Sequence, residues 1–178
     1  MIILASKPAY LTGLGIDDHR ITKNSSIASA KMKPLILAGV TVSKEYSPIA
    51  HSDGDVVYHA ISNAMFLAVG ERDIGYHFPD TDPNYSGIPG KKLLEYALGI
   101  VEKAGYSVNN VTVMITAGQP RISPHVESMK KNTAKILKVS PSCIGIGATS
   151  GESLSDQVRG KGINVMALVC LKQRSKGK

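Results

Sequence analysis

Two residues near the start of the chain have types and a spacing that suit metal binding. Asp17 and His19 are separated by one residue, so on a strand both side chains would project from the same face. They would offer one oxygen and one nitrogen ligand, a mixture that zinc accepts. A polar strand end would have the same sequence, so this pair alone leaves the metal hypothesis open.

A second group of ionisable residues surrounds a glycine in residues 51–55 (HSDGD), and His59 follows one helical turn after Asp55. On a helix, Asp55 and His59 would share a face, where Asp55 could orient the histidine ring from a second shell. Ser52 and Asp53 are the expected N-caps of this helix. The density of ionisable groups makes a functional site as good an interpretation as a helix start with an incidental histidine.

Three further segments could contact a ligand. Prolines flank Asp80, Thr81 and Asp82, which would stiffen a turn that presents carboxylates and a hydroxyl. The segments 117–123 and 147–152 each lie at the end of an expected strand. The small residues of the first would leave backbone N–H and C=O groups for a ligand, and the hydroxyls and N–H groups of the second suit phosphate oxygens. Glu152 suits a divalent cation. Taken singly, each segment is indistinguishable from an ordinary turn.

Hydrophobic periodicity predicts the elements that would hold these residues. We expect strands at 9–16, 35–42, 110–116, 143–149 and 163–171, and helices at 54–69, 91–104 and 124–138. A flexible loop is expected at 20–33, an irregular loop at 73–90 and a basic tail at 172–178. This order predicts one domain over 1–178, with its core at 9–171. The expected fold is an α/β (α+β) sandwich of one mixed β-sheet and a layer of helices.

Composition narrows the function classes. The net charge of +7 is uneven, since residues 1–90 sum to −2 and residues 91–178 to +9. Two cysteines exclude a disulfide framework and a cysteine-based zinc site. The first residues do not have the pattern of a signal peptide, and no apolar run is long enough to span a bilayer. We therefore expect a cytoplasmic protein with no membrane partner. The basic balance raises nucleic-acid binding as an alternative, but no tryptophan and no recognisable binding motif support it.

The order of the motifs resembles a known enzyme family. A D-x-H pair is followed by A-H-S-D-G-D-x-x-x-H-A, D-I-G-x-x-F-P-D-T-D-P, a Q-P-R loop and A-T-S-x-E. This order resembles that of 2-C-methyl-D-erythritol 2,4-cyclodiphosphate synthase, from about Gly13 to Leu171. The resemblance implies that the 2-phosphate of 4-diphosphocytidyl-2-C-methyl-D-erythritol 2-phosphate attacks its β-phosphate and releases CMP. A zinc phosphohydrolase on a similar scaffold is the alternative enzyme class.

The resemblance also implies a role for each matching residue. Asp17, His19 and His59 would bind zinc, and Glu152 would bind a second divalent cation, Mg²⁺ or Mn²⁺. His51 and Ser150 would be catalytic and stabilise the transition state. The implied substrate-binding residues are Ser52, Asp73, Gly75, Phe78, Pro79, Asp80, Thr81, Asp82, Ala117, Gly118, Gln119, Pro120, Arg121, Ile122, Ser123, Ala148, Thr149 and Arg159.

The resemblance further implies a homotrimer with each site between neighbouring subunits, a cytidine diphosphate substrate and no nucleic-acid partner. The sequence departs from the family pattern in places. The 20–33 segment is longer than in compact relatives, and Asp156 replaces a common aromatic substrate contact. Lys161 stands where some relatives have an acidic residue, near a cavity on the trimer axis. Regulation through that cavity is therefore not expected here.

Overall fold

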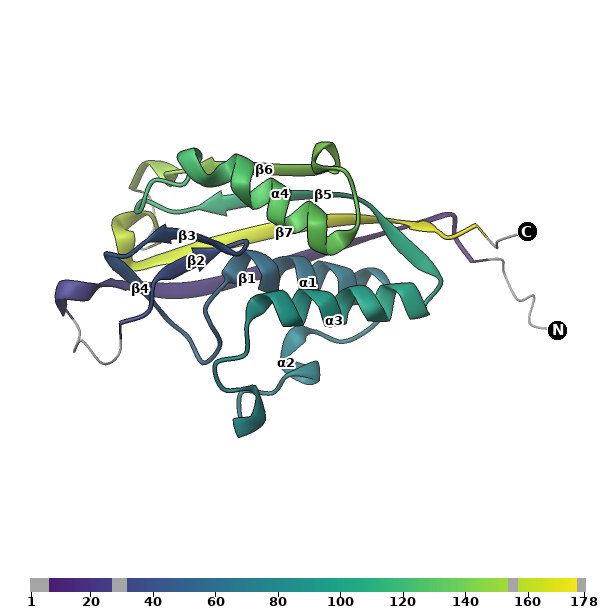
Figure 1. The fold of residues 1–178 in the computed structure, drawn as a ribbon, viewed down its shortest axis with the longest axis horizontal. Coiled ribbons are helices and arrows are strands. Elements are labelled where there is room, and N and C mark those ends of the chain that lie inside the picture. The colour runs from purple at the N-terminus through teal and green to yellow at the C-terminus, as the bar shows by residue number, and fades with distance from the viewer. Residues whose placement is uncertain (1–6, 27–31, 154–156, 176–178) are drawn as a thin grey trace.

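A five-stranded mixed sheet forms the centre of the computed structural model, which describes residues 7–26, 32–153 and 157–175 (Figure 1). In spatial order the strands are β4 (Tyr46–Ile49), β1 (Tyr10–Lys23), β7 (Gly162–Gln173), β5 (Tyr106–Thr116) and β6 (Ile144–Thr149). Neighbouring strands are antiparallel except β5 and β6, which are parallel. A separate hairpin pairs β2 (Leu35–Leu37) with β3 (Val40–Ser43).

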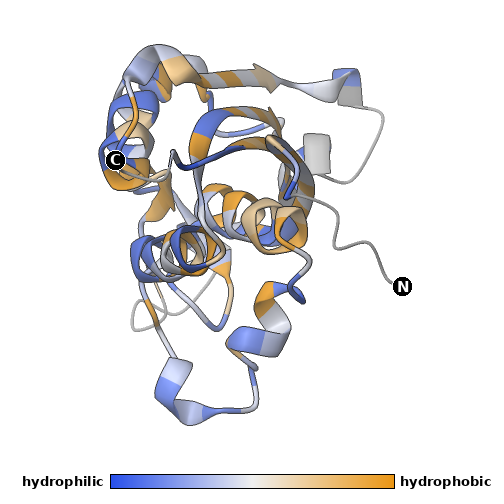
Figure 2. Cartoon of the chain, turned by 90° about the vertical axis from the view of Figure 1, so that its right-hand side faces the viewer, coloured by the Kyte–Doolittle hydropathy of each residue, from blue (hydrophilic) through white to orange (hydrophobic). Residues whose placement is uncertain are grey.

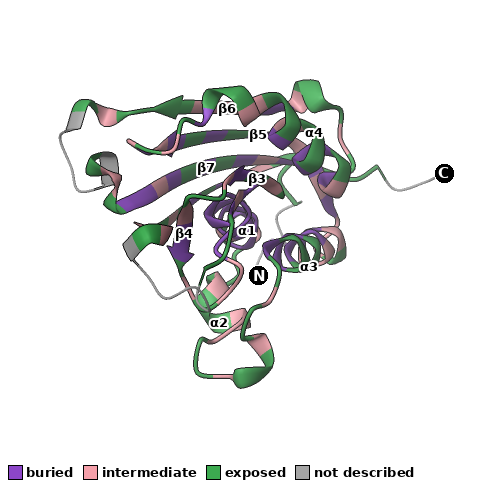
Figure 3. Cartoon of the chain, turned by 60° about the vertical axis from the view of Figure 1, so that its left-hand side comes forward, coloured by how far each residue is buried: buried purple, intermediate pink, exposed green. Residues whose placement is uncertain are grey.

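Helices cover one face of this sheet, as Figures 1 and 3 show. The long ones are α1 (Val56–Ala68), α3 (Gly90–Lys103) and α4 (Val126–Leu137), and a single turn, α2 (Ile74–His77), follows α1. The 3-10 turns are η1 (Asn24–Ser26), η3 (Pro83–Tyr85), η4 (Ser123–His125), η5 (Pro141–Cys143) and η6 (Gly151–Ser153), and η7 (Gln157–Lys161) is a π-helical turn. The expected mixed sheet with a layer of helices is thereby confirmed.

The hydrophobic core lies between the helices and one face of the sheet. Along β7, Val165 and Ala167 are fully buried, whereas the alternating Met166 and Leu168 point away from the helices and are exposed. This is the two-residue period of a strand with one covered face. The helices show the matching pattern, since hydrophilic residues gather on the outer sides of the exposed helices (Figure 2). In the part of the chain that is described, no helix is long and apolar enough to cross a bilayer.

Two glycines bring β1 unusually close to α1. A Cβ atom at Gly13 would lie 2.0 Å from the Ala64 carbonyl oxygen, and one at Gly15 would lie 2.1 Å from the Ala60 carbonyl oxygen. Both distances are far shorter than any normal contact, so only glycine allows the helix backbone to rest directly on the strand. The same strand face continues through Asp17 and His19, which therefore also point toward α1.

The structure corrects the expected boundaries around the first strand. The flexible loop expected at 20–33 is wrong for residues 20–23, because β1 continues to Lys23 and pairs with β4 from Arg20–Ile49 to Lys23–Tyr46. Residues 27–31 of that segment lie outside the described residues. Strand β4 was not expected, and its proline and its short length hide it from a search for apolar alternation. The irregular loop expected at 73–90 includes α2 and η3.

Candidate metal and substrate site

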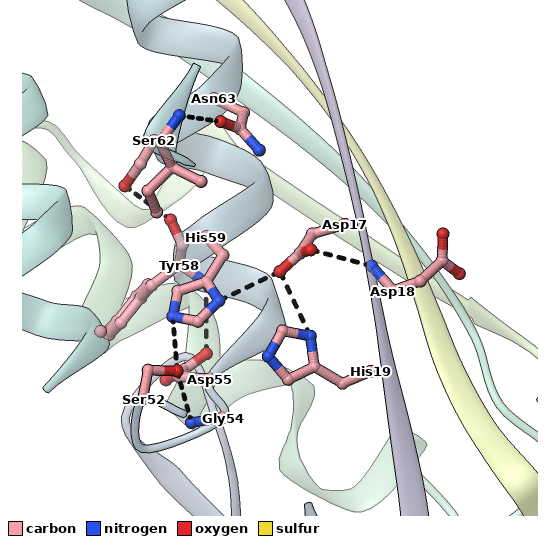
Figure 4. Close-up of polar contacts among 12 residues, drawn as sticks. Asp17, Asp18, His19, Ser52, Gly54, Asp55, Tyr58, His59, Ser62 and Asn63 are labelled. Atoms are coloured by element: carbon pink, nitrogen blue, oxygen red, sulfur yellow. Dashed lines mark hydrogen bonds and ion pairs between the residues drawn. The ribbon is translucent and has the colours of Figure 1, made fainter. Parts of the chain in front are cut away.

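Asp17, His19 and His59 converge where β1 faces α1 (Figure 4). One donor atom from each residue lies within 4.8 Å of the other two, which makes the trio a possible metal site. The Asp17 Oδ2 atom is 3.0 Å from His59 Nδ1 and 3.3 Å from His19 Nδ1. The two imidazole ring centres are 5.1 Å apart. The chain therefore assembles the oxygen and nitrogen donors that the sequence predicted.

The chemistry of these donors fits a resident metal ion. His59 is buried, and His19 Nδ1 is a buried nitrogen that makes no hydrogen bond among the described residues, because the Asp17 carboxylate 3.3 Å away is not aligned for one. Burial lowers the pKa of His19 below its ordinary value of 6.5, although the Asp17 carboxylate acts in the opposite direction. A neutral imidazole is the form that binds a cation. Two imidazoles and one carboxylate form a donor set that zinc accepts, and they leave a coordination position open.

Ser52, rather than Asp55, contacts the His59 ring. The Ser52 Oγ lies 3.3 Å from His59 Nε2 and accepts a hydrogen bond from the Gly54 N–H at 3.1 Å. Because His59 Nδ1 faces Asp17, a contact at Nε2 fixes the orientation of the ring. Ser52, the second residue of the HSDGD segment, thus contacts His59 on the side of the ring opposite the Asp17 carboxylate (Figure 4).

The expected second-shell role of Asp55 is wrong. Its carboxylate is fully buried and accepts hydrogen bonds from the N–H groups of Ala38, Gly39 and Tyr58, at 2.8, 2.7 and 3.2 Å. It is also the N-cap of α1, a position that the sequence assigned to Ser52 or Asp53. A capping carboxylate turns back toward the free N–H groups of the first turn, away from the side chain one turn later. Burial raises the pKa of Asp55 to about 6, although the three N–H donors act in the opposite direction.

A cleft of about 570 Å³ opens beside the three metal-site residues. It is lined by the histidine and serine that precede α1 and by much of the segment after α2. The predicted site residues on its wall are Asp17, His19, His51, Ser52, His59, Gly75, Phe78, Asp80, Thr81 and Asp82. Pro79 is not on this wall, and Asp73 caps α2 by accepting a hydrogen bond from the Tyr76 N–H at 3.0 Å. Three separate sequence motifs therefore face one cavity.

Most of the remaining predicted residues gather at a second, smaller cavity of about 260 Å³. Its wall contains Ala117, Gly118, Gln119, Arg121, Ile122, Ser123, Ala148, Thr149 and Ser150. A hydrogen bond of 3.0 Å from the Ala117 N–H to the Thr149 carbonyl oxygen joins the two segments, and the Gln119–Pro120 peptide bond is cis. Glu152 and Arg159 are exposed and line neither cavity, and Asp156 lies outside the described residues.

The two cavities belong to different parts of the sheet. The first lies at β1, and the second lies at the ends of β5 and β6. Strands β7 and β5 separate β1 from β6, so β1 and β6 are about 14 Å apart at the usual strand spacing. Among the described residues of one chain, the predicted metal side and the predicted nucleoside side line separate cavities.

Two side chains that support the cleft were not singled out as site residues. Asp53 accepts hydrogen bonds from the Asp55 N–H at 3.0 Å and the Gly90 N–H at 2.8 Å, which ties the HSDGD segment to the start of α3. Asn63 accepts one from the Ile74 N–H at 2.8 Å and so anchors α2 to α1. The first Asp53 contact is a local turn that sequence can suggest. The partners that are distant in sequence leave no local signal.

Comparison with known proteins agrees with this geometry. Residues 10–172 match the model of the YgbB family. The 2-C-methyl-D-erythritol 2,4-cyclodiphosphate synthase of Halothermothrix orenii is 40% identical over 165 residues, which cover 93% of this chain and 95% of that protein.

Solved structures give the same result. IspF of Plasmodium falciparum, in a complex with CDP, superposes with a TM-score of 0.80 at 28% identity, over 96% of this chain and 100% of that one. The bifunctional IspDF of Campylobacter jejuni has a TM-score of 0.84 at 32% identity, over 92% of this chain and 42% of that longer one. From the match over most of its length and the identity of its curated relatives, the chain belongs to the YgbB family, the family of 2-C-methyl-D-erythritol 2,4-cyclodiphosphate synthases.

Proposed function

We propose that this chain converts 4-diphosphocytidyl-2-C-methyl-D-erythritol 2-phosphate into 2-C-methyl-D-erythritol 2,4-cyclodiphosphate and CMP. The observation that carries the proposal is the convergence of Asp17, His19 and His59 on a cleft that His51, Ser52 and the 78–82 loop also line. Family membership supports the reaction, and the Plasmodium falciparum relative solved with CDP supports a cytidine nucleotide as the ligand.

The reaction needs positioning and charge neutralisation more than a base. An oxygen of the 2-phosphate forms a bond to the β-phosphorus, and the bond from that phosphorus to the oxygen of CMP breaks, so no water is consumed. The attacking phosphate is already an anion, so no side chain has to remove a proton from it. Asp17, His19 and His59 would hold a zinc ion, which when bound supplies a Lewis acid for the β-phosphate. His51 and Ser52 would contact the phosphates from the same wall.

We propose that the cytidine side of the site comes from the second cavity. The backbone groups of residues 117–123 would bind the cytosine, and Ala148 and Thr149 would add substrate contacts beside them. Ser150 would contribute a hydroxyl to the transition state, and Glu152 would bind the second cation, Mg²⁺ or Mn²⁺, near the leaving CMP. Asp73 and Gly75 would contact the ribose, and Arg159 would add a further substrate contact.

A complete site then requires more than one copy of the chain, and we propose a homotrimer with each site between neighbours. The separation of the two cavities across the sheet supports this arrangement. The uncovered sheet face supports it too, because five large apolar side chains there are 43–49% exposed: Leu14, Ile16, Met114, Met166 and Leu168. A patch of this kind is typical of a surface that another subunit covers, and repeated head-to-tail contacts would close a ring.

Product analysis tests the reaction directly. The protein is incubated with the diphosphocytidyl substrate, Zn²⁺ and Mg²⁺ in ¹⁸O-labelled water. The masses of the products are then measured by mass spectrometry. Cyclisation yields CMP and a cyclic diphosphate without label. A linear phosphate that carries ¹⁸O would identify a zinc-dependent hydrolase instead, and the absence of CMP would refute both reactions.

A further inference from the structure

We propose that His77 is a positioning residue whose ring fixes the loop that forms one wall of the substrate cleft. The proposal rests on the proposed function, since it names how the substrate side of that cleft is held in place. No motif assigned a role to His77, which lies between the expected substrate contacts Asp73 and Gly75 and the 78–82 loop.

Helix α2 has little of its own to hold it in place. It is a single turn of four residues, and Gly75 and Tyr76 are exposed. Figure 3 shows α2 and the segment that follows it projecting from the body of the protein below α1. A helix this short is not stable by itself, so contacts with neighbouring elements must position it. Its N-terminal end has such a contact in the bond from the Ile74 N–H to Asn63.

At the C-terminal end, the His77 ring supplies the contact. The ring stacks on Phe66 of α1, with 4.3 Å between ring centres and an angle of 25° between the planes. It also lies 5.7 Å from the ring of Tyr96 on α3. The His77 side chain is only 9% exposed, and Phe66 is fully buried. The imidazole therefore packs against both α1 and α3 and attaches the C-terminal end of α2 to them.

The polar atoms of the His77 ring do not explain its burial. Its Nε2 atom has no hydrogen-bond partner among the described residues, and the nearest carboxylate oxygen, on Glu71, is 3.8 Å away. This distance exceeds a hydrogen bond. The shape and the stacking surface of the ring must then be what holds α2, and another flat aromatic ring should do the same.

The loop on the cleft wall continues directly from this anchor. Phe78 packs against Tyr96 and Tyr85, with ring centres 5.0 and 5.1 Å apart, and Asp80, Thr81 and Asp82 follow on the wall of the cleft. Without the His77 ring, the start of this loop loses its contact with α1. Substrate binding should weaken, whereas the metal residues on β1 and α1 keep their places.

Three variants test the proposal. His77→Ala removes the stacking ring, and His77→Phe keeps a ring of similar shape. Glu71→Gln is the control, because it removes the charge of the nearby carboxylate and leaves the ring stack intact. We expect His77→Ala to raise the KM for the diphosphocytidyl substrate about three- to tenfold, as the loss of one aromatic pair allows, with kcat and zinc content unchanged. His77→Phe and Glu71→Gln should both behave like the unmodified protein.

Amide hydrogen exchange of residues 74–82 provides a readout that does not depend on the reaction. Exchange without substrate should be faster in His77→Ala and normal in His77→Phe. Normal KM and normal exchange in His77→Ala would overturn the proposal, and so would a His77→Phe variant as impaired as His77→Ala. If the unmodified protein makes no cyclic product, the proposed function fails, but the exchange data still decide the role of His77.

Discussion

Gly15 sets the distance between β1 and α1, and replacing it with alanine should damage the metal site without removing a ligand. Asp17 follows two residues later on the same face of β1, and His59 adjoins Ala60 on α1. The added Cβ would meet the Ala60 carbonyl oxygen at 2.1 Å and the Ala64 nitrogen at 2.5 Å. Both are backbone atoms, so no side-chain rotation can relieve the overlap.

The size of the displacement follows from these contacts. Real Cβ atoms essentially never come closer than 3.0 Å to another heavy atom, so α1 has to move about 0.9 Å away from β1. Metal–ligand distances tolerate changes of only about 0.2 Å. Overpacking of this severity typically costs about 3 kcal/mol in the free energy of unfolding. A displacement of about 1 Å at the reacting groups can lower the rate by about 100-fold.

The assay combines chemical denaturation, a zinc competition titration and CMP release. We expect Gly15→Ala to be less stable, to bind zinc more weakly and to release CMP about 100-fold more slowly. Gly145→Ala is the matched control, because its new Cβ would meet no atom closer than 3.8 Å. Normal zinc affinity together with normal activity in folded Gly15→Ala would refute the claim that this close approach positions the site.

Three further variants test other parts of the structure. Asp55→Asn should lower the free energy of unfolding by about 1–3 kcal/mol in denaturation experiments, because its amide would turn an N–H donor toward a backbone N–H. The pKa of Asp55 is raised from 3.8 to about 6 in the folded protein, so the free energy of unfolding of the unmodified protein should fall as pH rises from about 4 to 6. Asp55→Asn has no carboxyl group at this position and should not show that fall. Gly99→Ala, at a helical position with open space around it, should raise the free energy of unfolding by about 0.5–1 kcal/mol and leave CMP release unchanged. Leu168→Glu, on the uncovered sheet face, should lower the mass measured by sedimentation from trimer to monomer and abolish CMP release while zinc binding persists; an active monomer would contradict the shared site.

Part of the candidate metal site has a local signal in the sequence, whereas His59 was assigned as a ligand only by the resemblance to the family. Asp17 and His19 share a strand face by the two-residue period, and the long apolar stretches predicted the three main helices. The partner of His59 was misjudged because spacing along a helix does not reveal which way a capping carboxylate turns. The Asp55 carboxylate accepts hydrogen bonds from the turn of the β2–β3 hairpin, and no local sequence pattern indicates that this hairpin lies beside it.

Contacts between distant segments escaped prediction for the same physical reason. The bond from the Gly90 N–H to Asp53 and the stack of His77 on Phe66 depend on how the helices pack on the sheet. Likewise, residues 117–123 and 148–150 lie at the C-terminal ends of β5 and β6. They meet only because these two strands are paired in parallel. The motifs indicated which residues matter, and the topology determined which of them share a cavity.

The zinc content of the protein and of two variants tests the central claim most directly. After loading with Zn²⁺ and removal of free metal, elemental analysis should find about one zinc ion per chain in the unmodified protein, as a single three-residue site requires. Asp17→Ala and His59→Ala should lose that ion and CMP release together while remaining folded by circular dichroism. Unchanged zinc content in either folded variant would contradict the assignment of Asp17, His19 and His59 as the metal site.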